Sequence, residues 1–110
     1  MPDLSRILTA KTSLTLASLA RGAQPLVMGD LARARFRAWH RGTREADYTI
    51  GGFYDRYHAE WDKADLAWFE ALLEEDDAEI LGWAMGAISS PTKYDGPLMD
   101  ALKKLDFVTI

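Results

Sequence analysis

From residue 30 onward, apolar residues recur at intervals of three and four, the spacing that places side chains on one face of an α-helix. The clearest run consists of Ile50, Phe53, Tyr54, Tyr57 and Trp61. No stretch of useful length alternates between apolar and polar residues as a half-buried strand does. The pattern therefore predicts an all-α protein, a small five-helix bundle.

Capping residues divide this pattern into separate helices. Asp30 is suited to cap the first helix, which should end near Gly42, and Thr43 is suited to cap the second. The third helix should begin with a capping box, because Asp62 is followed three residues later by Asp65. These signals separate the first three helices from one another.

The last two helices have similar signals. Asp76 should cap the fourth helix, Gly86 should end it, and Pro97 should open the fifth. The pair Gly51-Gly52 interrupts the second helix, and we interpret it as a site of close packing or a bend. The apolar side chains expected to face the core from the last three helices are Leu66, Phe69, Leu72, Leu73, Ile80, Leu81, Trp83, Ala84, Leu98, Leu102 and Leu105.

The first 29 residues differ from the remainder, and we assign them to an N-terminal extension that precedes a helical domain of residues 30–110. Their only acid is Asp3, their basic residues are Arg6, Lys11 and Arg21, and Ser, Thr, Leu and Ala are frequent. Two interpretations stay open: an organellar transit peptide, or a sequence upstream of a true start at Met28. In either case we expect no stable structure in the extension, apart from a short helix that Ser13–Arg21 could form.

The composition excludes several kinds of chemistry. The chain has no cysteine, which excludes disulfides, thiolate zinc sites, cysteine-ligated iron–sulfur clusters and thiol nucleophiles. No apolar run approaches the roughly 20 residues that span a bilayer, so we expect a soluble protein without membrane insertion. His40 and His58 lack a metal-ligand spacing, and no phosphate-binding glycine loop is present. We predict no catalytic residues, no metal site and a structural role for His58.

The net charge of −4 is unevenly distributed. Residues 30–44 contain five arginines and one acid, whereas residues 74–79 are nearly all acidic. An arginine-rich helix can bind nucleic acid through its phosphates, or it can be a solvated face partly paired with the acidic segment. We favour the second interpretation and no nucleic-acid partner, because the whole chain is acidic. The arginines are Arg33, Arg35, Arg37, Arg41 and Arg44.

The junction between the first two helices contains the most informative residues of the chain. Gly42 follows Arg41 and precedes Glu45 by three residues. A glycine lacks side-chain bulk, so another surface can approach closely, and the two neighbours supply both signs of charge. This arrangement is suited to docking onto a partner. From the residues alone, Arg41 and Glu45 could instead form a simple i,i+4 helix pair worth under about 0.5 kcal/mol.

Residues 41–45, Arg-Gly-Thr-Arg-Glu, match the RGxxE signature of the succinate dehydrogenase FAD assembly factors, the SdhE-type flavinylation factors. The likeness extends to residues 36–47, 69–74, 76–83 and 94–98, and it covers about residues 30–106. One departure is Ala46, where a larger aliphatic residue or Met is expected. The chain therefore resembles this family over most of its length.

The resemblance implies an all-helical, non-catalytic, chaperone-like helper. It would bind the flavoprotein subunit of succinate dehydrogenase, or of fumarate reductase in bacteria, and promote covalent attachment of FAD to a histidine of that subunit. The helper would act on the FAD of its partner and bind no cofactor tightly itself. We expect a monomer, cytoplasmic if the source is bacterial and in the mitochondrial matrix if it is eukaryotic.

The resemblance also implies a partner-binding site at the helix junction. Gly42 would allow close approach, and Glu45 would reach toward the flavin-bearing pocket of the partner. Arg41 would make charge-assisted hydrogen bonds either to the partner or to Glu45. The rim of the site would consist of His40, Arg44 and Asp47.

Two other functional classes stay open at this stage. One is a regulatory interaction protein of the antitoxin type, which would bind a different partner. The other is a nucleic-acid binder that uses the arginine-rich helix, and its affinity would fall steeply with salt.

Overall fold

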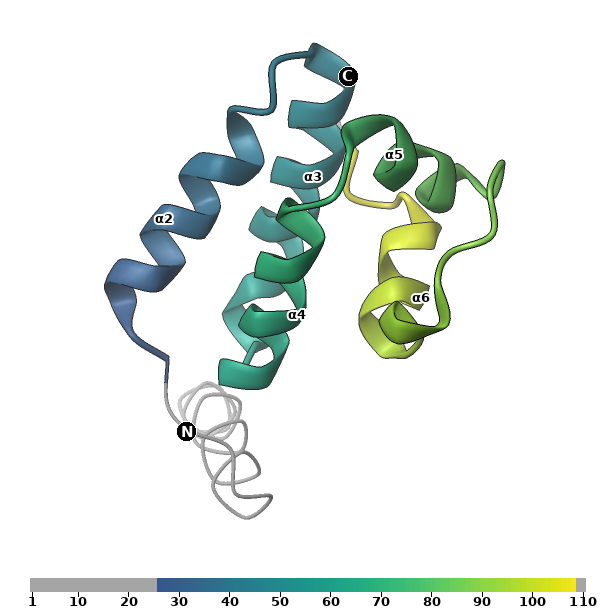
Figure 1. Ribbon diagram of the computed structural model, residues 1–110. Helices are drawn as coiled ribbons and strands as arrows, with labels where there is room; N and C mark the ends of the chain where they lie inside the picture. The colour runs from purple at the N-terminus through teal and green to yellow at the C-terminus, as the bar shows by residue number, and fades with distance from the viewer. Residues whose placement is uncertain (1–25, 109–110) are drawn as a thin grey trace, which may run out of the picture.

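The computed structural model describes residues 26–108, which form five α-helices, two short 3-10 helices and no strand (Figure 1). The α-helices are α2 (Met28–Trp39), α3 (Arg44–Tyr57), α4 (Lys63–Leu73), α5 (Asp77–Met85) and α6 (Pro97–Lys104). The 3-10 helices are η1 (His58–Glu60) and η2 (Thr92–Tyr94). The predicted all-α fold with five helices is confirmed. The predicted extension, apart from residues 26–29, lies outside the described residues.

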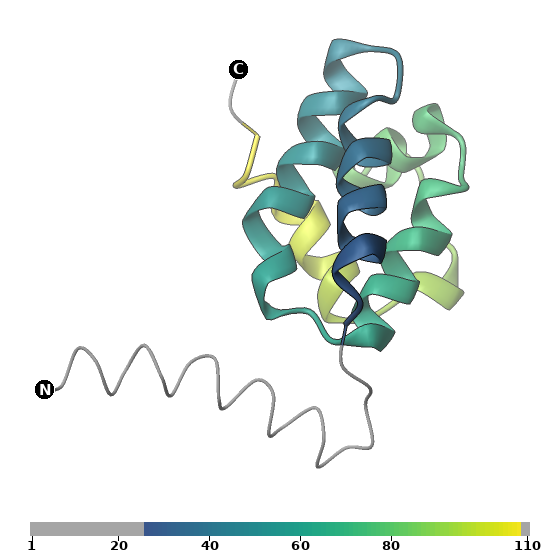
Figure 2. The same ribbon diagram turned by 90° about the vertical axis from the view of Figure 1, so that its left-hand side faces the viewer.

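The helices form two groups that meet along α3. In the first group α2 packs against both α3 and α4, and Figure 2 shows α2 lying over these two helices. In the second group α5 packs against α6, and α5 also contacts α3 (Figure 1). The turn between α2 and α3 lies at one end of the bundle (Figure 1). None of the helices described between residues 26 and 108 has the length and apolar content needed to cross a membrane.

An aromatic cluster around Phe53 joins α3 to α4 and to the segment that follows α6. Phe53 is completely buried, and its ring lies 5.9 Å from the ring of Phe69 on α4 and 5.5 Å from that of Phe107 near the C-terminus. Burial of aromatic rings removes large apolar areas from water, and tilted or edge-on pairs such as these add to that stabilisation. The largest fully buried side chains are Phe53, Phe69, Ile50, Leu72, Ile80, Met99 and Leu102.

Most of the predicted helix ends are confirmed. The Thr43 hydroxyl accepts a hydrogen bond of 3.2 Å from the backbone N–H of Ala46. Asp62 and Asp65 form a reciprocal capping box at the start of α4, with hydrogen bonds of 2.9 and 3.1 Å. Gly86 ends α5 in the left-handed region with φ of 76°, and Pro97 is the first residue of α6. Local sequence signals thus position four helix boundaries correctly.

Two predictions about helix ends are wrong. Asp30 is not an N-cap, because α2 begins at Met28 and the capping position is Val27. Asp30 lies in the first helical turn, where a carboxylate is also favoured by the helix dipole. Trp61 does not continue the face of α3, since that helix ends at Tyr57 and a 3-10 turn carries the chain to a buried Trp61.

Gly51 and Gly52 do not interrupt α3, which passes through both as a continuous helix. A Cβ atom at Gly51 would lie 2.3 Å from Cδ2 of the Trp39 ring, and one at Gly52 would lie 3.0 Å from the carbonyl oxygen of Phe107. The interpretation as close packing is therefore confirmed. At Gly51 the absent side chain lets the end of α2 approach α3, which brings the turn between them into a tight hairpin.

Candidate functional site

The turn between α2 and α3, residues 40–43, is exposed and bare at its centre. Gly42 has φ of 116°, a backbone conformation that residues with a side chain rarely adopt. A Cβ atom built at Gly42 would have no atom within 4 Å among the residues described, so only open space lies beside the backbone. The turn therefore has the accessibility that a docking surface requires.

Arg41 points inward, toward the junction between α4 and α5. Its Nε donates to Asp77 Oδ1 at 2.7 Å, and its two terminal nitrogens donate to the backbone carbonyls of Leu73 at 2.8 Å and Glu75 at 3.1 Å. Only 12% of its side chain is exposed. The guanidinium fork thus satisfies carbonyls at the end of α4 that have no partner within the helix.

The predicted alternative in which Arg41 pairs with Glu45 is therefore wrong. The guanidinium reaches a carboxylate and two carbonyls at the α4–α5 junction, whereas Glu45 is exposed to solvent at the start of α3. A charged group with three partners in a partly buried site is better satisfied than in a solvent-exposed pair. The idea of Arg41 as an internal brace is correct, but its partner is Asp77.

Asp47 holds the turn from the side of α3. Its Oδ1 accepts a hydrogen bond of 2.6 Å from the backbone N–H of Arg41. Together with the guanidinium contacts, this bond fixes Arg41 at both its main chain and its side chain. Asp47 is half-buried, so it braces the turn in addition to lining its surface.

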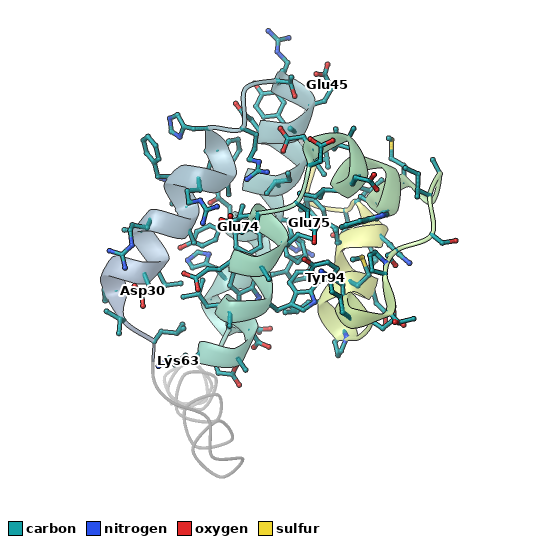
Figure 3. The ribbon with its side chains drawn as sticks, viewed as in Figure 1. Asp30, Glu45, Lys63, Glu74, Glu75 and Tyr94 are labelled. Carbon is teal, nitrogen blue, oxygen red and sulfur yellow. The ribbon has the colours of Figure 1, made fainter. Side chains whose placement is uncertain are left out.

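Arg44 and Glu45 point outward from the first turn of α3. Both side chains are exposed, and among residues 26–108 neither has an ion pair or a side-chain hydrogen bond. Figure 3 shows Glu45 at the end of the molecule, well away from Glu74 and Glu75 near its middle. These two charges are therefore available to a partner.

An open hollow of about 470 Å³ lies at the turn, which we call the turn hollow. On one wall His40 is fixed, because its ring stacks on Phe36 at 3.9 Å and its Nδ1 donates to the Phe36 carbonyl at 2.7 Å. The structure thus brings most of the predicted site residues to one place. The lining consists of His40, Gly42, Thr43, Arg44, Asp47 and Tyr48.

Ala46, the departure from the family pattern, faces the other way. Its side chain is completely buried, and it does not line the hollow although its neighbours Arg44 and Asp47 do. A side chain at this position therefore contributes to the core and not to the exposed surface of the turn.

A second hollow adjoins the turn and was not predicted from the sequence. It has a volume of about 340 Å³ and shares Arg44 and Tyr48 with the turn hollow. The signal that could have found it is the pair Leu81 and Met85, spaced four residues apart at the end of α5. We call this hollow the apolar groove, and its lining consists of Arg44, Glu45, Tyr48, Thr49, Leu81, Met85, Leu105 and Val108.

The arginines of α2 are paired with acids, as the solvated-face interpretation predicts. Arg33 pairs with Asp30, Arg35 with Asp55 at 3.5 Å, and Arg37 with Glu74. The pairs of Arg37 and Arg41 reach the acidic segment of residues 74–79 directly. Paired arginines have less charge to offer to phosphates, so the structure gives no support to nucleic-acid binding through this helix.

The end of α4 is also held by Tyr94 of η2. Its hydroxyl lies 2.6 Å from Glu75 Oε2 and 3.3 Å from the carbonyl oxygen of Ala71. Burial and the Glu75 carboxylate raise the pKa of Tyr94 to about 12, and the same hydrogen bond lowers the pKa of Glu75. Arg41 and Tyr94 therefore fix the end of α4 together.

His58 lies far from the turn and has structural contacts. Its Nδ1 donates to the Tyr54 carbonyl at 2.8 Å and its ring stacks on Tyr54 at 4.3 Å. In the part of the chain that the structure describes, no three His, Asp or Glu side chains are grouped as metal ligands would be.

The sequence is similar to known proteins over most of its length. The sequence profile of the family described as "Flavinator of succinate dehydrogenase" matches residues 32–106, which include the turn, most of α2 and all of α3 to α6. The chain is 31% identical over 91 residues to the FAD assembly factor SdhE of Acetobacter pasteurianus, covering 83% of this chain and 84% of that relative. No solved structure matches the chain. The chain therefore belongs to the succinate dehydrogenase flavinator family.

Proposed function

We propose that this chain is an assembly factor that docks its α2–α3 turn onto the flavoprotein subunit of succinate dehydrogenase and promotes covalent attachment of FAD. Its family and the name of its relative support the assembly function. The observation that supports the docking site is the turn itself. Gly42 is bare and exposed, Glu45 is a free carboxylate beside it, and Arg41 holds both in place from below.

The proposed mechanism acts through the conformation of the partner. Reactivity in flavin attachment belongs to the flavin and to the target histidine, because the cofactor carries the chemistry. A helper that binds one conformation of the subunit more tightly shifts the population toward it, by no more than its difference in affinity. If flavin and histidine are aligned in that conformation, the attachment is faster through positioning.

In this mechanism no residue of the chain is catalytic. Glu45 is proposed to contact the partner near the flavin-bearing pocket, and Arg44, His40 and Asp47 to form the rim of the interface. We further propose that the chain acts as a monomer, binds no flavin tightly by itself and can also serve fumarate reductase. Its bacterial relative favours the cytoplasm over the mitochondrial matrix as the location.

Reconstitution of flavin attachment tests the proposed function. The apo-flavoprotein subunit is incubated with FAD and the chain, and covalent flavin is read from fluorescence in a denaturing gel. Gly42→Arg should weaken binding at least about tenfold, because the long side chain fills the bare surface. Glu45→Ala should also lower flavinylation, with the melting temperature unchanged. Normal binding and flavinylation by both variants would contradict the proposed site.

Two matched variants control for effects on the fold. Gly96→Arg puts the same side chain on another glycine with positive φ, 142°, and no atom within 4 Å of its Cβ position among those described. Glu79→Ala removes an exposed glutamate from the first turn of α5, as Glu45→Ala does from α3. Both controls should flavinylate the subunit normally.

A further inference from the structure

The apolar groove lies between the start of α3, the end of α5 and the segment that follows α6. Leu81 and Met85 are four residues apart on α5, so their side chains share one face of the helix. Leu105 and Val108, which follow α6, also line the groove. Leu105 has φ of 55°, a left-handed conformation that ends α6 and turns the chain back toward α3.

Met85 makes this groove a surface and not a part of the core. It is 64% exposed although it is a large apolar residue at the edge of a hollow lined mainly by apolar atoms. Tyr48, on the ridge between the groove and the turn hollow, is 36% exposed. Contiguous exposed apolar surface with a polar rim is typical of interaction sites, and methionine adapts readily to different apolar partners.

The size and charge of the groove indicate what it can hold. Its volume of about 340 Å³ is near the lower end for ligand pockets, which suits one or two side chains better than a whole dinucleotide. Its rim carries both signs of charge, Arg44 and Glu45, and these two residues directly follow the proposed docking turn in the sequence. An apolar centre with a polar rim is the ordinary anatomy of a protein–protein interface.

We propose that the apolar groove receives one or two large apolar side chains of the flavoprotein subunit, with charged partner residues beside them that pair with Arg44 and Glu45. This inference rests on the proposed function and deepens it. The turn excludes bulk and permits close approach, while the groove anchors the partner through apolar contact. The two hollows form one continuous surface, because Arg44 and Tyr48 border both.

A pair of methionine variants tests the anchor. Met85→Glu places a charge at the edge of the groove, and it should raise the dissociation constant for the apo-flavoprotein subunit at least about tenfold. Met28→Glu is the matched control, since Met28 is 78% exposed at the far end of α2 and lines neither hollow. It should change the dissociation constant less than twofold. Met85→Gln, which adds no charge, should raise the dissociation constant by an intermediate factor. Met85→Glu and Met85→Gln should both melt at the temperature of the native chain.

Photocrosslinking identifies the occupant directly. A benzoylphenylalanine at position 85 should crosslink to an apolar segment of the flavoprotein subunit, and the same group at position 28 should not. Crosslinks within the chain or between two copies of it would overturn the inference, as would an unchanged dissociation constant for Met85→Glu. Failure of the inference is distinguishable from failure of the proposed function. If only the inference fails, Gly42→Arg disrupts binding and Met85→Glu does not. If the proposed function fails, the native chain does not promote flavinylation at all.

Discussion

The turn between α2 and α3 and the crossing of the same two helices both depend on a glycine, but in opposite ways. At Gly42 the space beside the backbone is empty, and a side chain would extend into solvent. At Gly51 the space is filled, because the Trp39 ring lies 2.3 Å from where a Cβ atom would be. Gly42 leaves a bare surface on the turn, where we propose that the partner docks, and Gly51 lets two helices of this protein touch.

This difference separates the residues that hold the hairpin from those that face outward. Gly51, Trp39 and Arg41 make contacts within the protein, whereas Gly42 and Glu45 have no side-chain contact to lose among residues 26–108. Substitutions of the first kind should mainly lower stability, and those of the second should mainly lower binding, with a modest loss of stability at Gly42 because of its positive φ. The RGxxE motif therefore spans both kinds, since its arginine belongs to the inside and its glycine and glutamate to the outside.

Arg41→Ala should have the largest effect on stability, because Arg41 is one of the residues that hold the hairpin. The variant loses the ion pair to Asp77 and leaves the carbonyls of Leu73 and Glu75 without their donor. We expect the free energy of unfolding to fall by about 2–4 kcal/mol. Denaturant unfolding measures this, with Arg37→Ala as the control. Arg37 pairs with Glu74 at the surface, so its loss should be under about 1 kcal/mol.

Gly51→Ala should have the next largest effect on stability. The added methyl group must displace the Trp39 ring, and overpacking of this kind costs about 1–3 kcal/mol. At a temperature where the variant is folded, its flavinylation activity should be close to normal. A variant as stable as the native chain would contradict the close packing of α2 against α3.

Gly42→Ala sharpens the comparison, because it adds backbone strain with almost no bulk. A residue with a side chain held in a sparsely populated backbone region costs about 1–3 kcal/mol, so stability should fall modestly at this φ of 116°. Binding to the flavoprotein subunit should be weakened far less than by Gly42→Arg. Equal losses from both substitutions would mean that the conformation of the turn, and not its bareness, is what the partner requires.

Tyr94→Phe should have the smallest effect on stability, and that effect should depend on pH. The hydrogen bond from Tyr94 lowers the pKa of Glu75 below its ordinary value of 4.5. The resulting stabilisation is complete above pH 4.5 and is lost as the pH falls through the lowered pKa. The raised pKa of Tyr94 contributes stability below pH 10, which is lost as the pH rises to about 12. The difference between the native chain and Tyr94→Phe should therefore shrink at both extremes. Thermal melts from pH 3 to 11 measure it, and flavinylation should be unchanged.

The sequence predicts the helices well because their signals are local. The capping box of Asp62 and Asp65 and the cap at Thr43 act within one turn, so adjacent residues are enough to recognise them. Asp30 was assigned wrongly because an acid is favoured both at the capping position and in the first turn. A local signal that is satisfied at two positions cannot distinguish between them.

The contacts that position the site could not be predicted in this way. Arg41 meets Asp77 across 36 residues of sequence, and no periodicity connects the two. The apolar groove likewise joins Leu81 on α5 to Leu105 after α6, two residues that the pattern assigns to the core. Both residues are only half-buried in the structure. An amphipathic pattern shows which face of a helix is apolar, but it does not show whether another helix covers that face.

The double attachment of Arg41 has a consequence for the speed of assembly. With its amide held by Asp47 and its guanidinium held at the α4–α5 junction, the turn is already ordered before any encounter. A preordered loop loses little conformational entropy on association, so less of the contact free energy is offset. Recruitment of an immature flavoenzyme should then be governed by diffusion and orientation, at ordinary rates of about 10⁵–10⁷ M⁻¹s⁻¹, without a slow rearrangement in the helper.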